Sequence, residues 1–467
     1  MASSYSPPFS ILIVGSGVFG LSTAYALTQR PEYAATKIIL LERLPFPAPD
    51  GSSIDSSRIV RADYADPAYT LLMQEAHPYW RGAFGAEGRY TEAGLCIVMD
   101  DDNDLGRRYM NASLENVQAK LGLKRGRREE GGEVTVLDDA EAVKGVMRNF
   151  DGEPGKCGYV NWRSGWAHAE DGVRYLRSLV ERTGRVDFLT KEVSRLIFSP
   201  DHTSVLGVHT TTGEQLTADL TILATGAWTP TLLDLRGIAS ANGQIMAYID
   251  LTDEEQTALG ANPTLLNESS GMFIIQPRDN VLKVARHGYG YANPQTIPHP
   301  EKDPSSGETI TVSVPYTNQT EPTHSIPAEG LHALRSYLTT TLPSLRNRPF
   351  TSTRICWYTD TPTSDWLISY HPTYRGLFLA TGGSGHGYKF LPVVGERIVD
   401  VMMGKDRDEL GGVLRRKWAW PGRRVEGARG GRGGEGHVWT DDWRGGRKGM
   451  VLGEEMGWVG GREKGKL

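Results

Sequence analysis

Gly15, Gly17 and Gly20 have the spacing of a turn that binds a dinucleotide. Apolar β-type residues precede this turn, and residues 21–27 after it have a helical composition. In such a turn the first glycine permits a tight bend, the second lets backbone N–H groups approach a pyrophosphate, and the third lets the helix pack against the strand. The helix N-terminus then faces the phosphate charge. The pattern predicts a dinucleotide bound along residues 15–20, which include Val18 and Phe19.

Glu42 ends a second apolar strand, residues 37–42, about 22 positions after Gly20. A carboxylate at this place accepts hydrogen bonds from a ribose hydroxyl, and we expect its neighbour Arg43 at the same site. Glycine spacing alone is weak evidence, because glycine-rich turns are common. A strand, turn, helix, second strand and acid in this order are strong evidence for a dinucleotide site.

Three cationic residues have more than one interpretation. Arg58 and Arg61 lie three positions apart. They are either a solvated pair or a cationic lining for a flavin or a substrate carboxylate. The planar guanidinium group is well suited to bind either ligand. Lys283 lies inside an apolar strand, residues 280–287, where its ammonium is either solvated or buried and functional. The pattern alone favours the outward-facing, solvated alternative for Lys283.

Two later segments could return small residues to the dinucleotide. A hydrophobic strand runs into Gly226 and Trp228, where a second backbone segment could approach the dinucleotide. The same pattern is equally typical of a tight strand–helix connection. Another strand runs into the glycine-rich residues 382–390 ahead of a helix, an arrangement that can hold a flat or anionic ligand. Lys389 beside it could anchor a phosphate or carboxylate, although an ordinary loop is as good an explanation. Such distant segments fit a flavoprotein better than a nicotinamide dehydrogenase.

Composition narrows the class of protein. The 467 residues suffice for two or three domains, and the net charge of −5 gives no case for nucleic acid. Three cysteines cannot form a disulfide framework, and none is spaced like a metal ligand, so no metal is expected. The N-terminal apolar run is interrupted by glycines and too short to span a membrane. We therefore expect an intracellular protein.

Residues 406–467, here called the C-terminal segment, are rich in glycine and arginine with scattered tryptophans. Because such a composition buries little apolar surface, we expect a mostly disordered or loosely packed extension. An RNA-binding tail is less favoured, because the segment carries many acids and lacks a regular repeat. Its last residues, Gly-Lys-Leu at 465–467, resemble a degenerate peroxisomal Ser-Lys-Leu address, so the expected compartment is the cytoplasm or the peroxisome.

Taken together, residues 10–405 resemble the D-amino-acid-oxidase superfamily and its sarcosine oxidase group. They are most similar to the fungal fructosyl amino acid oxidases (amadoriases) and the saccharopine and pipecolate oxidases. The resemblance rests on the following segments, in chain order: 15–20 with Glu42, 57–61, 224–228, 243–244, Lys283, 354–358 and 383–390.

The resemblance implies a role for several residues. Cys356 matches the cysteine that forms a thioether to the flavin, so FAD is expected to be covalent. Lys283 matches the lysine over the flavin face that assists oxygen reduction, which reverses the outward-facing preference. Arg58 matches a basic residue near the flavin ring, while Arg61 and Lys389 match the pair that holds a substrate carboxylate. Further cofactor contacts are implied for Ser57, Val193, Gly226, Trp228, Gly383, Gly385, His386 and Gly387.

One departure stands next to Arg58. Ile54 and Asp55 replace the histidine and glycine of sarcosine oxidases, so that active-site histidine is missing.

The resemblance implies an α/β fold in which the chain alternates between two domains. We expect an interrupted Rossmann-like FAD domain of residues 8–85, 159–235 and 350–405. A mixed-sheet α+β substrate domain would consist of residues 86–158 and 236–349.

The implied activity is an FAD-dependent oxidase of the C–N bond of a secondary amine or amino acid, using oxygen and releasing hydrogen peroxide. The candidate substrates are fructosyl amino acids, saccharopine, pipecolate and N-methyl amino acids. Alternatives are a biosynthetic tailoring oxidase, an amine dehydrogenase with another electron acceptor, and a non-catalytic flavin- or RNA-binding protein.

Overall fold

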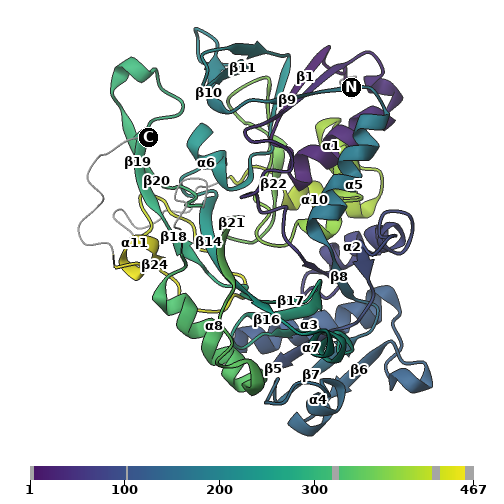
Figure 1. Cartoon of the computed structure of the whole chain (residues 1–467). Helices are drawn as coiled ribbons and strands as arrows, with labels where there is room; N and C mark the ends of the chain where they lie inside the picture. Colours follow the sequence, from purple (N-terminus) through teal and green to yellow (C-terminus); the bar gives the residue numbers. More distant parts are fainter. Residues whose placement is uncertain (1–4, 101–103, 318–324, 423–431, 458–467) are drawn as a thin grey trace.

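The computed structural model describes residues 5–100, 104–317, 325–422 and 432–457 (Figure 1). Two large sheets organise these residues. One is six-stranded and mostly parallel, and the other is ten-stranded and mixed. The chain passes between the two sheets several times, and the combination of helices with parallel and mixed sheets confirms the expected α/β fold.

The six-stranded sheet has the order β22-β23-β13-β1-β2-β9. Only β22 runs antiparallel to its neighbour. Its central strands are almost entirely apolar because both faces are covered, as is usual for parallel sheets. Helix α1 packs against α5 and α9. The bounds are β1 Ser10–Val14, β2 Lys37–Glu42, β9 Val186–Thr190, β13 Leu220–Leu223, β22 Leu367–Tyr370, β23 Leu377–Thr381, α1 Val18–Gln29, α5 Ala169–Arg182 and α9 Val394–Met402.

The carboxyl ends of the parallel strands meet at one edge of this sheet. β1 ends before Gly15, β2 at Glu42, β13 before Ala224 and β23 before Gly382. Ligands of open parallel sheets bind at this edge. The sheet therefore brings together four segments that lie up to 367 positions apart in the sequence (Gly15 to Gly382).

The ten-stranded sheet has the order β24-β18-β14-β17-β16-β15-β5-β7-β6, and β21 also pairs with β14. Helix α8 packs against β14 and β17, in the lower part of Figure 1. The bounds are β5 Leu95–Met99, β6 Val134–Leu137, β7 Cys157–Asn161, β14 Ser240–Asp250, β15 Thr264–Asn267, β16 Met272–Arg278, β17 Val281–Arg286, β18 Tyr291–Ala292, β21 Ser352–Asp360, β24 Met450–Val451 and α8 Ala328–Thr341.

The remaining strands and α-helices lie outside the two large sheets. Three short sheets, β3-β8-β4, β10-β11-β12 and β19-β20, lie beside the two large ones. The strand bounds are β3 Arg58–Val60, β4 Tyr90–Thr91, β8 Gly165–Ala167, β10 Val193–Phe198, β11 Val205–Thr210, β12 Gln215–Thr217, β19 Pro294–Pro298 and β20 Thr309–Ser313. The helix bounds are α2 Pro67–Arg81, α3 Asp104–Leu121, α4 Ala140–Val146, α6 Thr229–Leu232, α7 Asp253–Gly260, α10 Glu409–Lys417 and α11 Leu452–Glu455.

Two strands differ from the expected division of the chain. β7 begins before residue 159 and pairs with β5 and β6 in the ten-stranded sheet. β21, expected in the FAD domain, pairs along its whole length with β14. These pairings could not be predicted, because the residues of an apolar strand do not indicate which sheet the strand joins.

The expectation of a disordered C-terminal segment is wrong for its described part. Helix α10 is followed by Trp418, which is fully buried, and β24 pairs in parallel with β18. Trp443 is buried as well. The composition misled because these side chains pack onto domains that are already folded instead of forming a core of their own. Residues 465–467, with the expected peroxisomal address, lie outside the described residues.

Across the described ranges, none of the helices combines the length and the apolar character needed to cross a membrane.

Candidate active site

The turn after β1 has the geometry that its glycines predict. Gly15 has a φ of +103°, and a Cβ there would lie 2.5 Å from the carbonyl oxygen of Ala224. A Cβ on Gly20 would lie 1.9 Å from the carbonyl oxygen of Gly15. Larger residues are therefore excluded, because the helix, the turn and the segment after β13 are in direct backbone contact. The N-terminus of α1 is left pointing toward the carboxyl edge of the sheet.

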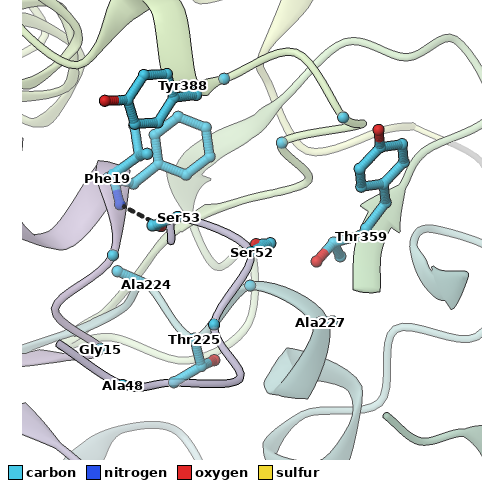
Figure 2. Close-up of a pocket in the computed structure, with 18 of the residues that line it drawn as sticks. Gly15, Phe19, Ala48, Ser52, Ser53, Ala224, Thr225, Ala227, Thr359 and Tyr388 are labelled. Carbon is cyan, nitrogen blue, oxygen red and sulfur yellow. Dashed lines mark hydrogen bonds between the residues drawn. The ribbon is translucent and has the colours of Figure 1, made fainter. Parts of the chain in front are cut away.

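Ser53 contacts the first turn of α1 and was not among the predicted site residues. Its hydroxyl accepts a hydrogen bond from the Val18 backbone N–H at 3.1 Å. Figure 2 shows Ser53 beside Phe19 and Ser52, with this hydrogen bond as a dashed line. Glu42 accepts bonds from the Ser16 N–H at 2.9 Å and hydroxyl at 2.8 Å, so its carboxylate is fixed beside the turn. A run of small polar residues next to Arg58 was the available signal for Ser53.

One cavity runs from this turn to the ten-stranded sheet and contains most of the predicted site residues. The predicted residues that line it are Gly15, Gly17, Val18, Phe19, Glu42, Arg43, Ser57, Arg58, Arg61, Val193, Gly226, Trp228, Lys283, Gly383, Gly385, His386, Gly387 and Lys389. Gly20 and Cys356 are the two predicted residues outside the lining. Gly20 acts through helix packing, as described above. Within the cavity, the guanidinium of Arg43 lies 4.2 Å from the ring centre of Trp228.

Lys283 is buried and faces the cavity, with 2 % of its surface exposed. Its ammonium forms an ion pair with Asp55 and donates to the Ser57 carbonyl at 2.9 Å. Burial lowers the pKa of Lys283 to about 8, although the Asp55 carboxylate raises it; Arg58 lowers it further. The solvated, outward-facing alternative is wrong.

Asp55 links Lys283 to a second cation. Its carboxylate pairs with Arg58 as well, and accepts a bond from the Tyr248 hydroxyl at 2.7 Å. Burial alone would raise the pKa of Asp55, but the charges of Lys283, Arg58 and Arg354 lower it well below the ordinary value. The residue that replaces a sarcosine oxidase glycine is thus an ionised partner of two cavity cations.

Cys356 lies directly behind this cluster. Its thiol is fully buried, and its Sγ accepts a hydrogen bond from Arg58 Nη2 at 3.5 Å. The strand that carries it, β21, places Tyr358 two residues further on, in the cavity lining. Cys356 is therefore adjacent to the cavity at the level of Arg58 and Lys283.

Arg61 and Lys389 approach the cavity from different elements. Arg61 is buried, donates to the Tyr109 hydroxyl at 3.2 Å, and keeps a buried Nη1 without a hydrogen-bond partner. Lys389 donates to the Tyr64 hydroxyl at 2.8 Å and to the His386 carbonyl at 3.1 Å. Burial and the charge of Arg61 lower the pKa of Lys389 well below its ordinary value. An anionic ligand would satisfy Arg61 Nη1 and favour the charged form of Lys389.

His386 is fixed by hydrogen bonds on both ring nitrogens. Nε2 donates to the Ser364 carbonyl at 2.9 Å, and Nδ1 accepts from the Tyr64 hydroxyl at 3.2 Å. Burial, with the nearby charge of Lys389, lowers the pKa of His386 well below its ordinary value, so the ring is neutral. These bonds hold the glycine-rich loop rigid.

Arg444, from the C-terminal segment, supports the same loop. Its Nη2 donates to the Ser384 carbonyl at 3.0 Å and to the Ser364 hydroxyl at 3.0 Å. Its side chain is buried. Arg444 was not predicted as a site residue, because the glycine- and arginine-rich composition of the C-terminal segment indicates disorder.

Within the described ranges, no group of three or more His, Cys, Asp or Glu side chains is placed to hold a metal ion. The features present fit FAD instead. A backbone cradle and the Glu42 carboxylate occupy one end of the cavity, and the Lys283 ammonium and an unsatisfied N–H of Arg61 occupy the other. The fold and cavity define a flavin-dependent oxidoreductase.

The chain belongs to the FAD dependent oxidoreductase family, which it matches over residues 10–401. It is 34 % identical to amino acid oxidase imqH of Aspergillus flavus, with 89 % of this chain and 98 % of the relative covered. It is 27 % identical to L-saccharopine oxidase of Schizosaccharomyces pombe, over 88 % and 93 % of the two chains. The solved structure of fructosamine oxidase (Amadoriase II) from Aspergillus fumigatus aligns with a TM-score of 0.76 and 26 % identity, over 95 % of each chain.

Proposed function

We propose that this enzyme oxidises the C–N bond of a secondary amine or amino acid and passes the electrons to oxygen, which yields hydrogen peroxide. The observation that carries the proposal is the convergence of Lys283, Arg61 and Lys389 on the cavity that begins at the Gly15 turn. The relatives named as amino acid, saccharopine and fructosamine oxidases support the same reaction class. The product is an imine, which water hydrolyses to an amine and a carbonyl compound.

Arg61 and Lys389 hold the substrate carboxylate. Arg61 supplies its unsatisfied Nη1, and Lys389 becomes charged as the carboxylate arrives. Binding of the carboxylate fixes the position of the C–H bond that is oxidised. The rate increases mainly because this bond is held close to the group that accepts the hydride. Bound FAD supplies the hydride acceptor.

Lys283 serves the second half of the reaction. Its buried ammonium provides a fixed positive charge, which stabilises the negative charge that develops on oxygen during reduction. Asp55 keeps that ammonium protonated near neutral pH, because the carboxylate raises the pKa that burial lowers. Arg58, paired with the same carboxylate, would contact the flavin ring.

The flavin is covalently attached through Cys356. Support comes from the position of the thiol, which contacts Arg58 and shares a strand with the cavity residue Tyr358. The remaining predicted cofactor residues along the cavity bind the same FAD without a covalent bond. We place the reaction in the cytoplasm or the peroxisome. The compartment is tested by comparing the location in cells of the protein with residues 465–467 and of the protein without them.

The test is an amine-dependent peroxide assay with N-methyl amino acids, pipecolate, saccharopine and fructosyl amino acids. Peroxide formed in proportion to oxygen consumed is the expected result. Silence with all four substrate classes would refute the proposal. If the substrate bleaches the flavin but no peroxide forms, and an added quinone restores the flavin absorbance, the protein is an amine dehydrogenase instead.

A further inference from the structure

The inner part of the cavity has an apolar floor next to Lys283. Leu266 of β15 and Phe273 and Ile275 of β16 line it. Leu266 pairs with Phe273, and Ile275 pairs with Lys283 across antiparallel strands. Directly opposite residues project from the same face of a sheet. The ammonium of Lys283 lies 5.7 Å from the ring centre of Phe273, so this floor adjoins the reacting centre.

A chain of aromatic rings runs from the cavity residues Tyr358 and His287 to Arg61. The ring centres of Tyr358 and His287 are 5.8 Å apart, and those of His287 and Trp443 are 5.9 Å apart. Trp443 in turn lies 5.9 Å from Tyr109, whose ring centre is 5.7 Å from the Arg61 guanidinium. Burial and the nearby charge of Arg444 lower the pKa of His287 well below its ordinary value, so its ring, which lines the cavity with Tyr358, carries no charge.

The charges at this end suit a single carboxylate. Lys283 and Arg58 are both paired with Asp55. Lys389 already donates to two acceptors, and Arg61 holds a buried N–H without a partner. Of the described residues that line the cavity, the acidic ones are Glu42, the last residue of β2, and Glu192, which follows β9; both lie at the dinucleotide end.

We infer that the preferred substrate is an N-alkyl amino acid with one carboxylate and an apolar, ring-sized side chain. This inference rests on the proposed function and narrows it. A sugar substituent lying on the floor of Leu266, Phe273 and Ile275 would leave hydroxyl groups without partners, which is costly. A substrate with several carboxylates would require cations beyond Arg61 and Lys389. An apolar side chain replaces water on the floor without either penalty.

The test compares kcat/KM for N-methylleucine and N-methylphenylalanine with those for N-methylaspartate, saccharopine and a fructosyl amino acid. We expect the two apolar substrates to exceed the other three by about 100-fold, the scale on which an apolar pocket rejects an added polar group. Binding is measured separately with carboxylates that cannot be oxidised. Titration calorimetry should show tighter binding of 3-phenylpropanoate than of glutarate.

Leu266→Asn probes the floor directly, because asparagine is of similar size but polar. We expect about a tenfold or greater loss of kcat/KM for N-methylleucine, and a smaller advantage over N-methylaspartate. Flavin content should be unchanged. Leu206→Asn is the matched control, since Leu206 is exposed on β11 outside the cavity.

The possible outcomes separate the two proposals. Peroxide production with saccharopine or a fructosyl amino acid as the best substrate would overturn the inference and leave the proposed function standing. Equal binding of 3-phenylpropanoate and glutarate would overturn the inference as well. Absence of both peroxide and flavin bleaching with every substrate would refute the proposed function itself.

Discussion

The ion pair between Lys283 and Asp55 predicts how the oxygen reaction depends on pH. With a pKa of about 8, Lys283 is charged in roughly ten of eleven molecules at pH 7 and in one of eleven at pH 9. If the ammonium is the group that stabilises the developing negative charge, the rate of flavin reoxidation falls through this range. Above pH 8 the slope approaches tenfold per unit.

The informative perturbation is Asp55→Asn. It removes the charge that raises the pKa of Lys283 and retains burial and Arg58, which lower it. The midpoint of the oxygen reaction should therefore move below pH 8. Lys283→Met should abolish the pH dependence and slow reoxidation by about 100- to 1000-fold, the usual scale for loss of one fixed stabilising group.

The assay reduces each enzyme with substrate in the absence of oxygen and mixes it with oxygenated buffer in a stopped-flow instrument between pH 6 and 10. Flavin absorbance reports reoxidation, and flavin content with thermal melting shows that each variant is folded. A flat wild-type profile would refute the reasoning, and so would a midpoint that moves upward in Asp55→Asn.

Three further variants test other parts of the structure. Cys356→Ala should release flavin into the supernatant on acid precipitation, whereas Cys157→Ala should keep it in the pellet; identical behaviour would exclude the covalent link. Gly20→Val should abolish flavin binding, because a Cβ meets the Gly15 carbonyl at 1.9 Å, and normal flavin content would contradict this packing argument. Burial raises the pKa of Glu268 to about 8, so between pH 4.5 and 8 the unfolded chain ionises while the native carboxyl stays protonated. Stability then falls with rising pH by up to about 1.4 kcal/mol per unit. Glu268→Gln should therefore melt at a higher temperature than wild type at pH 8, with a smaller difference at pH 5, and a pH-independent difference would count against it.

The sequence predicts well those parts of the site that depend on local pattern. The Gly15 turn and Glu42 follow from a strand, a turn, a helix and a second strand that are contiguous. The direction of the Lys283 side chain could not be predicted from local pattern, because β17 is buried on both faces and its apolar residues do not alternate with polar ones. Its environment depends on Asp55, which is 228 positions away.

Composition failed for the C-terminal segment for a related reason. A low apolar content indicates that a segment cannot fold alone, but it does not indicate whether the segment packs on another domain. Trp443 and Arg444 find their partners in α3, in the connection after β15 and in the glycine-rich loop. Those partners are recognisable only once the fold is known.

The cavity is built from segments that lie far apart in the sequence, and this affects when the cavity can form during synthesis of the chain. A chain leaving the ribosome completes β1 and the Gly15 turn early, but their neighbour β13 follows about 200 residues later and β23 later still. Arg444, which secures the glycine-rich loop, is synthesised after all of these strands. Flavin capture therefore waits until β13, β23 and the glycine-rich loop have been synthesised, and until then β1 lacks its partner strand β13.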